Sequence, residues 1–383
     1  MSDSENFEEE RSPEDFDENV EHEGGNNEEA VRKQALTKEI IAESISIPYR
    51  LGYGFSYAYV KLDCSDKNLL DIELLRSYIH LRFVILSNNF IGDLSPLTEL
   101  SNLQYLKADN NQITSVESLK SLQYLQYVDL SSNKLTTINN LSLPYLRHFK
   151  VNDNLITALK SETNTNLTSE QLPDLHTLEL RGNRLDTLNG IDDMINLKTL
   201  YCAENTLRRL EGISSLKSLV RLHLRDNRIS KLNEFTENLT SLEYINLRGN
   251  QISKFSEVKR LNCLPSLKFL SLIDNPITEK ENYRQMVIGL LNKLHRLDKQ
   301  RISNTFRSTA VEFVTKHAEI LEQELNEADT IEEQTPEGME EGLNEENVKV
   351  DDEDAGIASA KDQIENDKEE EEEEDEDEEE EDS

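Results

Sequence analysis

Side chains able to do catalytic or metal chemistry are few in this sequence, and none has the spacing that such chemistry needs. The chain has 383 residues with 7 His and 3 Cys. It contains no H-E-x-x-H helix, no C-x-x-C pair, no G-x-x-x-x-G-K-[ST] loop and no G-x-S-x-G turn. Gly52 and Gly54 lack the third glycine and the preceding strand of a dinucleotide loop. The sequence therefore predicts no enzyme, no cofactor and no metal site.

The polar residue that does recur at a fixed spacing is asparagine. The stretch LVRLHLRDNRI has the pattern L-x-x-L-x-L-x-x-N-x-I, which is typical of a leucine-rich repeat. Leu222 and Leu224 lie two apart on a strand, so both enter a core, whereas His223 and Arg225 face outward. Asn227 carries an acceptor and two donors on a short side chain, so it can satisfy turn backbone groups that the next coil buries.

Nine asparagines occupy this position at a nearly constant period. The steps between them are 22, 22, 21, 29, 22, 22, 23 and 25 residues. A period of 22 is too short for a full helix in each coil, so 3₁₀ turns or short helices are expected on the convex side. The 29-residue step contains a polar insertion at residues 160–172, which is interpreted as a surface loop rather than a docking loop. The ladder asparagines are Asn89, Asn111, Asn133, Asn154, Asn183, Asn205, Asn227, Asn250 and Asn275.

These repeats predict an α/β solenoid, a leucine-rich repeat horseshoe with 22-residue repeats, a degenerate N-terminal repeat and a helical C-terminal cap. Thr37 is expected to cap a helix over residues 38–46. The cap helix is expected to place Tyr283, Val287, Leu290, Leu291 and Leu294 on one apolar face. The predicted organisation is a disordered acidic tail at 1–35, an N-terminal helix and capping repeat at 36–80, the array with its cap at 81–300, a helix at 301–328, and a disordered acidic tail at 329–383.

The helical spacing after the array, over residues 303–326, has two interpretations. The helix either folds back on the cap or presents an amphipathic face to a partner. The sequence leaves both open.

The residues that face outward between the leucines form the predicted concave, protein-binding face. Tyr and Arg are favoured at protein–protein anchor points, although aromatic residues are also ordinary strand formers. An alternative occupant of the Arg row is the acidic tail of the same chain. Arg225→Glu is expected to leave melting nearly unchanged and to weaken partner binding. The predicted binding residues are Phe83, Tyr105, Tyr127, Arg181, Tyr201, Arg221, His223, Arg225, Tyr244, Arg248 and Phe269.

Charge is distributed very unevenly along the chain. Residues 51–300 hold 30 Lys/Arg and 28 Asp/Glu, whereas the flanks hold 11 of the 41 basic and 49 of the 77 acidic residues. Acidic flanks repel phosphates, so neither nucleic acid nor a membrane is an expected partner. No apolar run is long enough to span a bilayer, and the first residues do not form a secretion signal. Three cysteines, with Cys202 in a buried leucine position, suit a reducing cytoplasmic compartment.

Several segments resemble one family in particular. They are YAYVKLDCSDKNLLDIELLRSYIHLRFVILSNN, LSPLTELSNLQYLKADNNQI, LPDLHTLELRGNRL, LVRLHLRDNRI, LEYINLRGNQI and IDNPITEKENYRQMVIGLLNKLHRLDK. Over about residues 51–300 the chain is similar to the leucine-rich repeat-containing protein 23 family of motile cilia. The resemblance implies a structural protein of the axoneme, located in the head of a radial spoke and bound to other spoke proteins, with no small-molecule substrate.

Two other functions stay open at this point. The same repeats and cap would suit a regulatory subunit of a protein phosphatase. Repeats joined to a Glu/Asp tail would suit a histone-binding acidic nuclear protein, in which the tail mimics nucleic acid for basic partners.

Overall fold

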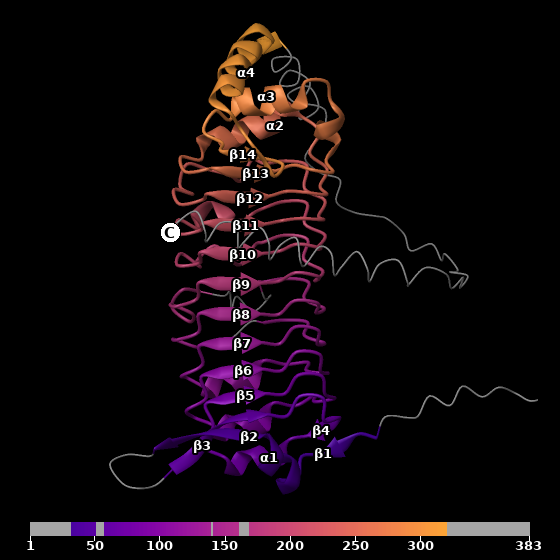
Figure 1. Ribbon diagram of the computed structural model, residues 1–383, viewed down its shortest axis with the longest axis vertical. Helices are drawn as coiled ribbons and strands as arrows, with labels where there is room; N and C mark the ends of the chain where they lie inside the picture. The colour runs from indigo at the N-terminus through magenta and orange to yellow at the C-terminus, as the bar shows by residue number, and fades with distance from the viewer. Residues whose placement is uncertain (1–31, 51–56, 139–140, 161–167, 320–383) are drawn as a thin grey trace, which may run out of the picture. The chain divides into compact units, whose positions relative to one another are not determined.

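A sheet of thirteen strands runs through the part of the chain that the structure describes (Figure 1). This computed structural model describes residues 32–50, 57–138, 141–160 and 168–319. The chain divides into two units, Met1–Asp329 and Thr330–Ser383, and the second lies wholly outside the described residues. The predicted disorder of residues 1–31 and 329–383 therefore stays a prediction.

From β3 to β14 the strands are parallel, and each pairs with the strand of the next coil. An antiparallel strand closes each end of the sheet, β2 (Ile45–Arg50) beside β3 and β15 (Gln300–Arg301) beside β14. This arrangement confirms the predicted leucine-rich repeat solenoid. The parallel strands are β3 (Tyr57–Asp63), β5 (Phe83–Ile85), β6 (Tyr105–Lys107), β7 (Tyr127–Asp129), β8 (His148–Lys150), β9 (Thr177–Glu179), β10 (Thr199–Tyr201), β11 (Arg221–His223), β12 (Tyr244–Asn246), β13 (Phe269–Ser271) and β14 (Arg296–Leu297).

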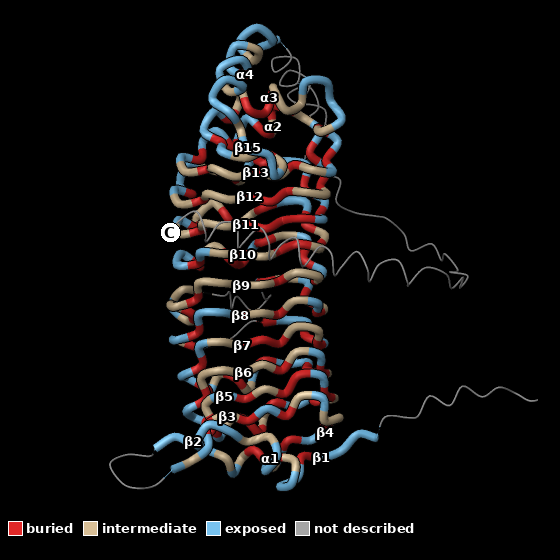
Figure 2. The backbone as a smooth tube through the Cα atoms, in the orientation of Figure 1, coloured by how far each residue is buried: buried red, intermediate tan, exposed pale blue. Residues whose placement is uncertain are grey.

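The core lies directly behind the middle residue of each strand. Leu222 is in register with Leu200 and Ile245 of the neighbouring coils, and all three are fully buried. Leu224, just past the strand, is also fully buried. Figure 2 shows the buried backbone continuing from coil to coil through the stack. Each coil is thus stable only between two others, because its apolar side is covered by its neighbours.

The asparagine ladder connects each coil to the coil before it. Asn227 Nδ2 donates to the carbonyl of Cys202 at 2.9 Å in the preceding coil and to that of Leu224 at 3.1 Å in its own. Its Oδ1 accepts from the N–H of Leu207 at 3.0 Å. These buried backbone groups have no strand partner, so each would cost free energy if left unsatisfied. The other eight make the equivalent bonds: Asn89, Asn111, Asn133, Asn154, Asn183, Asn205, Asn250 and Asn275.

The side opposite the sheet carries short helical turns, as the repeat length predicts. The turns are η1 (Glu73–Ser77), η2 (Ser95–Glu99), η3 (Glu117–Ser121), η4 (Ile213–Ser215), η5 (Leu261–Cys263), η6 (Pro276–Glu279) and the short helix α2 (Phe255–Arg260).

Within the predicted insertion at residues 160–172, residues 161–167 lie outside the described residues.

At the N-terminal end the structure differs from the predicted boundaries. Strand β1 (Gln34–Ala35), expected within a disordered tail, pairs with β4 (Leu69–Asp71), because the next residue, Leu36, is buried against the first coil. The Thr37 hydroxyl caps α1 (Lys38–Ser44) by accepting from the Ile40 N–H. The helix ends before Ile45 rather than after Ser46, since both residues pair with β3 as part of β2.

At the C-terminal end, helix α3 (Tyr283–Leu290) covers the last coil and buries Met286, Val287 and Ile288. Asp298, directly after β14, takes the place of a backbone carbonyl of the next strand, because its Oδ1 accepts from the Leu272 N–H at 2.7 Å. Its Oδ2 accepts from the Tyr283 hydroxyl at 2.7 Å. Burial raises the pKa of Asp298, although these two donors favour its charged form.

Helix α4 (Asn304–Lys316) folds back on α3, which decides between the two interpretations for these residues. Ala310 is fully buried, and a Cβ on Gly289 would lie 2.4 Å from the Ala310 carbonyl oxygen. The Arg307 guanidinium donates to the carbonyls of Asn292 and of Leu294. Helix α4 therefore belongs to the cap. Its predicted continuation to residue 328 lies outside the described residues beyond 319.

Candidate protein-binding face

The strands set out the side chains of the candidate face in parallel rows, because the residues on either side of each buried middle residue point away from the core. Strict register keeps residues of one row on neighbouring strands. Neighbouring strands lie about 4.8 Å apart, which is close enough for rings of one row to stack. The eleven predicted residues fall in three such rows, but their surroundings differ between the two halves of the solenoid.

In the N-terminal half, aromatic rings follow one another along the first position of the strands. The centroids of Tyr105 and Tyr127 are 4.5 Å apart and their planes differ by 6°. Phe83 lies 6.3 Å from Tyr105, and His148 lies 6.2 Å from Tyr127. Phe83, at the edge of this series, is 36% exposed. We call Phe83, Tyr105, Tyr127 and His148 the aromatic ladder.

A pocket of about 320 Å³ opens along the aromatic ladder. Gln104, Gln126 and Arg147, which precede the strands, form its other wall. Within the described residues neither glutamine amide has a hydrogen-bond partner in the fold, so both can bind a ligand from outside. Burial raises the pKa of Tyr127, and nearby Asp129 adds to this, so the hydroxyl stays protonated and can donate a hydrogen bond.

In the C-terminal half, the same face is occupied by ion pairs. Arg181 Nη2 lies 2.6 Å from Glu204 Oε1, and Arg225 Nη2 lies 3.1 Å from the same oxygen. Burial alone would raise the pKa of Glu204, but hydrogen bonds and charge from both arginines hold it below its usual value. Arg248 pairs in the same way with Asp274 at 2.9 Å. The Arg row is therefore largely neutralised by the fold itself.

Arg225 and His223 are buried, which differs from their predicted exposure on the concave face. Arg225 is 5% exposed, because Glu204 and Asp226 hold its guanidinium against the sheet. His223 is 6% exposed and lies between the rings of Tyr201 at 4.3 Å and Tyr244 at 4.9 Å. Both sequence positions face away from the core, but neighbouring side chains cover them.

The His223 ring has an unusual environment. Burial, followed by the charges of Arg221 and Arg225, lowers its pKa to about 3. Among the described residues neither ring nitrogen has a hydrogen-bond partner. The imidazole is therefore neutral at physiological pH and behaves as an aromatic spacer between the two tyrosines.

The other predicted residues of this half lie near the surface. Tyr201, Arg221 and Tyr244 are half-buried around His223. Phe269 has the Arg296 guanidinium over its ring at 5.7 Å.

Sequence reasoning overlooked the row that precedes each strand, including Gln104, Gln126 and Arg147 of the pocket. It also overlooked an exposed pair, Tyr124 and Tyr145, whose rings stack at 5.9 Å. The usable signal was that both tyrosines hold the same position of successive repeats, 21 residues apart.

The described residues contain neither a candidate metal cluster nor a candidate membrane-spanning helix. No group of three or more His, Cys, Asp and Glu there could hold a metal ion. None of the helices in those ranges is long and apolar enough to cross a membrane.

Comparison with known proteins gives the family. A model described as leucine-rich repeat matches residues 199–326, and one described as leucine-rich repeats (2 copies) matches residues 101–143. Leucine-rich repeat-containing protein 23 of Bos taurus is 40% identical over 298 residues, covering 72% of this chain and 79% of that protein. The Homo sapiens protein is 39% identical over 296 residues, covering 72% and 78%. This chain belongs to the leucine-rich repeat-containing protein 23 family.

A solved leucine-rich repeat protein of Leptospira interrogans is 26% identical to this member of the family. The match covers 62% of this chain and 71% of the Leptospira protein, with a TM-score of 0.43. Neither of the two family relatives has a name that describes an enzyme. Together with the repeat architecture, family membership identifies the chain as a leucine-rich repeat scaffold for protein–protein interaction.

Proposed function

We propose that this chain is a non-catalytic structural component of the radial spoke head in motile cilia, where it binds other spoke proteins through its concave face. The observation that carries the proposal is its membership of the leucine-rich repeat-containing protein 23 family, shown by 40% identity over 298 residues. The cap residues at both ends of the sheet support it, since they leave the strand face as the broad surface for a partner.

Within that face the aromatic ladder is the proposed anchor for a spoke partner. Its rings are large and have few rotors to immobilise, and the pocket beside them is lined with hydrogen-bonding amides. The C-terminal half offers less, because its arginines already bind carboxylates of the same chain. A partner would have to break those pairs before it could use them.

Crosslinking mass spectrometry on intact cilia tests the proposal. Lys107 and Lys150 follow the aromatic ladder on β6 and β8, so we expect both to crosslink to another spoke protein. Lys134, exposed and beyond the ladder asparagine of its coil, is the matched control and should crosslink less.

Two results would contradict the proposal. The first is release of the protein entirely into the soluble fraction when cilia are extracted. The second is co-purification with a phosphatase catalytic subunit or with histones in place of spoke proteins, which would favour one of the other two functions.

A further inference from the structure

The rings of the aromatic ladder are unevenly spaced. Tyr105 and Tyr127 stack at 4.5 Å with nearly parallel planes, so nothing fits between them. The two outer steps are wider and tilted: Phe83 lies 6.3 Å from Tyr105 with 39° between the planes, and His148 lies 6.2 Å from Tyr127 with 40°. Each outer step therefore leaves space at the ring edges. We call the Phe83–Tyr105 step the first notch and the Tyr127–His148 step the second notch.

The two notches are two strand spacings apart. Their four rings occupy the same register position on β5, β6, β7 and β8. The first notch lies midway between β5 and β6, and the second lies midway between β7 and β8. At about 4.8 Å for each strand, the centres of the notches are about 9.6 Å apart. A ligand that fills both must repeat an apolar group at this distance.

A polyproline II helix has this repeat. It has three residues per turn and rises about 3.1 Å per residue, so residues three apart lie on one face about 9.3 Å apart. An extended strand repeats a face every two residues, or about 6.8 Å, and two turns of α-helix rise about 10.8 Å. Proline rings are compact and apolar, and they favour this conformation before binding, which reduces the entropy lost on association.

The wall of the pocket offers hydrogen bonds to such a ligand. Gln104 and Gln126 line it one coil apart, each directly before its strand. Neither side-chain amide has a hydrogen-bond partner among the described residues. A polyproline II segment has no internal hydrogen bonds, so its carbonyls are free to accept from these amides. Aromatic-lined grooves with such donors are a recurrent binding site for proline-rich segments.

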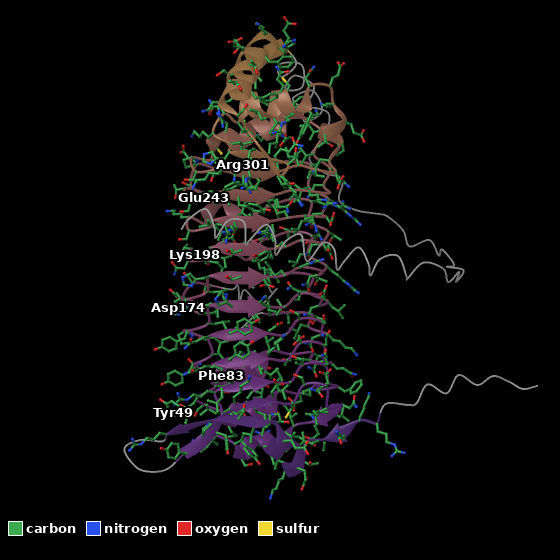
Figure 3. The ribbon with its side chains drawn as sticks, viewed as in Figure 1. Tyr49, Phe83, Asp174, Lys198, Glu243 and Arg301 are labelled. Atoms are coloured by element: carbon green, nitrogen blue, oxygen red, sulfur yellow. The ribbon has the colours of Figure 1, made fainter. Side chains whose placement is uncertain are left out.

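The charge beside the second notch favours an acidic ligand. Arg147 lines the pocket there, and its Nε lies 4.0 Å from Asp174 Oδ2, with the two side chains 59% and 42% exposed. An ion pair this long and exposed contributes little, so a second carboxylate can approach Arg147. Arg82, beside the first notch, already lies over the Tyr49 ring at 4.3 Å. Figure 3 shows Phe83 and Asp174 on the side of the stack where the strands begin.

We propose that the aromatic ladder binds a proline-rich segment of a partner in the polyproline II conformation. Two prolines three residues apart occupy the two notches, and an acidic residue beside the proline of the second notch pairs with Arg147. The inference rests on the proposed function in one respect, that the partner binds at the aromatic ladder. It does not require the partner to be a spoke protein.

Synthetic peptides test the proposal on the purified full chain. We expect a labelled peptide containing EPAAPE to bind about tenfold more tightly than one containing EPAPAE, which has the same composition but prolines two residues apart. Fluorescence anisotropy measures both affinities. KPAAPK should bind more weakly than EPAAPE, and this difference should shrink near 1 M salt, where the Debye length is about 3 Å. Equal binding of EPAAPE and EPAPAE would overturn the proposal.

Substitutions in the chain locate the peptide. Phe83→Ala opens the first notch and should weaken binding of EPAAPE about tenfold. Tyr124→Ala removes an exposed ring outside the aromatic ladder and is the matched control, with binding unchanged. Arg147→Gln should remove the preference for EPAAPE over KPAAPK but keep the preference over EPAPAE. Thermal melting checks that each variant is folded. If Phe83→Ala binds EPAAPE as well as the native chain does, the peptide lies elsewhere and the proposal fails.

The peptide experiment and the crosslinking of cilia can fail separately. Crosslinks to spoke proteins without binding of EPAAPE would support the spoke proposal and overturn this inference. Binding of EPAAPE at the notches without crosslinks to spoke proteins would support this inference and contradict the spoke proposal.

Discussion

The aromatic ladder on β5–β8 and the ion-paired segment on β9–β13 share one scaffold but use it differently. Both present the same rows on the same face, over the same buried leucines and the same asparagine ladder. On β5–β8 the rings stack beside a pocket lined by Gln104 and Gln126, whose amides have no hydrogen-bond partner among the described residues. On β9–β13 the charged groups bind one another, and His223 is enclosed between two tyrosines.

This difference distinguishes side chains that stabilise the fold from side chains that can bind a partner. Groups that satisfy each other within the fold contribute to stability and offer a partner little, because they must first be separated. Groups whose hydrogen-bonding capacity is unused can contribute to binding at little cost to the fold. The two halves should therefore respond oppositely to substitution, with stability changing in one and partner affinity in the other.

The largest expected effect tests whether the scaffold is really the same in both halves. Leu130 and Leu224 hold the same repeat position and are both fully buried. Leu130→Ala and Leu224→Ala should each lower the free energy of unfolding by about 2–5 kcal/mol, because each leaves a cavity. Urea unfolding of the full chain measures this. A loss confined to one half would show that the coils are not equivalent.

The next effect concerns Arg225. The sequence alone suggested that Arg225→Glu would leave melting unchanged, but the structure buries this side chain against Glu204 and Asp226. We now expect a loss of about 2–3 kcal/mol in the free energy of unfolding, since the change buries like charges together. Arg248→Glu, at a side chain 33% exposed, is the matched control and should cost less. If Arg225→Glu and the native chain melt at the same temperature, Arg225 does not stabilise the fold and is again a candidate for partner binding.

Because of His223, the free energy of unfolding should depend on pH through the ion-paired segment on β9–β13. The pKa of His223 is about 3 in the folded chain, below the ordinary value of about 6.5, so the unfolded chain takes up the proton first. This contribution to stability is complete above pH 6.5 and is lost progressively as the pH falls toward 3. The free energy of unfolding should drop by about 2 kcal/mol between pH 7 and pH 5. Denaturant titrations at both values measure it.

The matched variant for this titration is His223→Phe, which keeps a ring between Tyr201 and Tyr244. It should remove most of the drop between pH 7 and pH 5. Glu204, whose pKa is lowered, loses its contribution only in more acidic solution and does not confuse the comparison. An unchanged pH slope in the variant would mean that His223 is not the group responsible.

The smallest change in stability is expected for a substitution in the aromatic ladder on β5–β8. The same substitution should cause the clearest loss of partner binding. Phe83→Ala removes a ring that is 36% exposed, so the free energy of unfolding should change by less than about 1 kcal/mol. Affinity for the proposed spoke partner should fall by about tenfold or more if the aromatic ladder is its anchor. Binding of the purified variant to isolated spoke proteins measures this. Unchanged affinity would move the anchor elsewhere on the face.

The predictable part of the fold was the part that repeats. Nine asparagines and their leucines specified the strands, the core positions and the turns between them, because each depends only on the nearest coils. The cap helix α3 was also predictable, since its apolar residues recur at helical spacing.

The structure had to supply the contacts made by segments that lie outside the repeat pattern. That Leu36 docks β1 against β4, and that Ala310 meets Gly289, could not be read from spacing, because both join segments outside the repeat pattern. For the candidate face, the sequence predicted which residues form the outward-facing rows. It did not predict which of their side chains are exposed to solvent.

The sequence by itself determined which side chains point away from the core, because strand alternation is a local property. Only the tertiary structure decided which of them solvent can reach. Arg225 is covered because Glu204, one coil away, attracts it, and the aromatic ladder remains open because its rings stack along the coils. Such outcomes depend on the packing and charge of neighbouring coils, which no single repeat encodes.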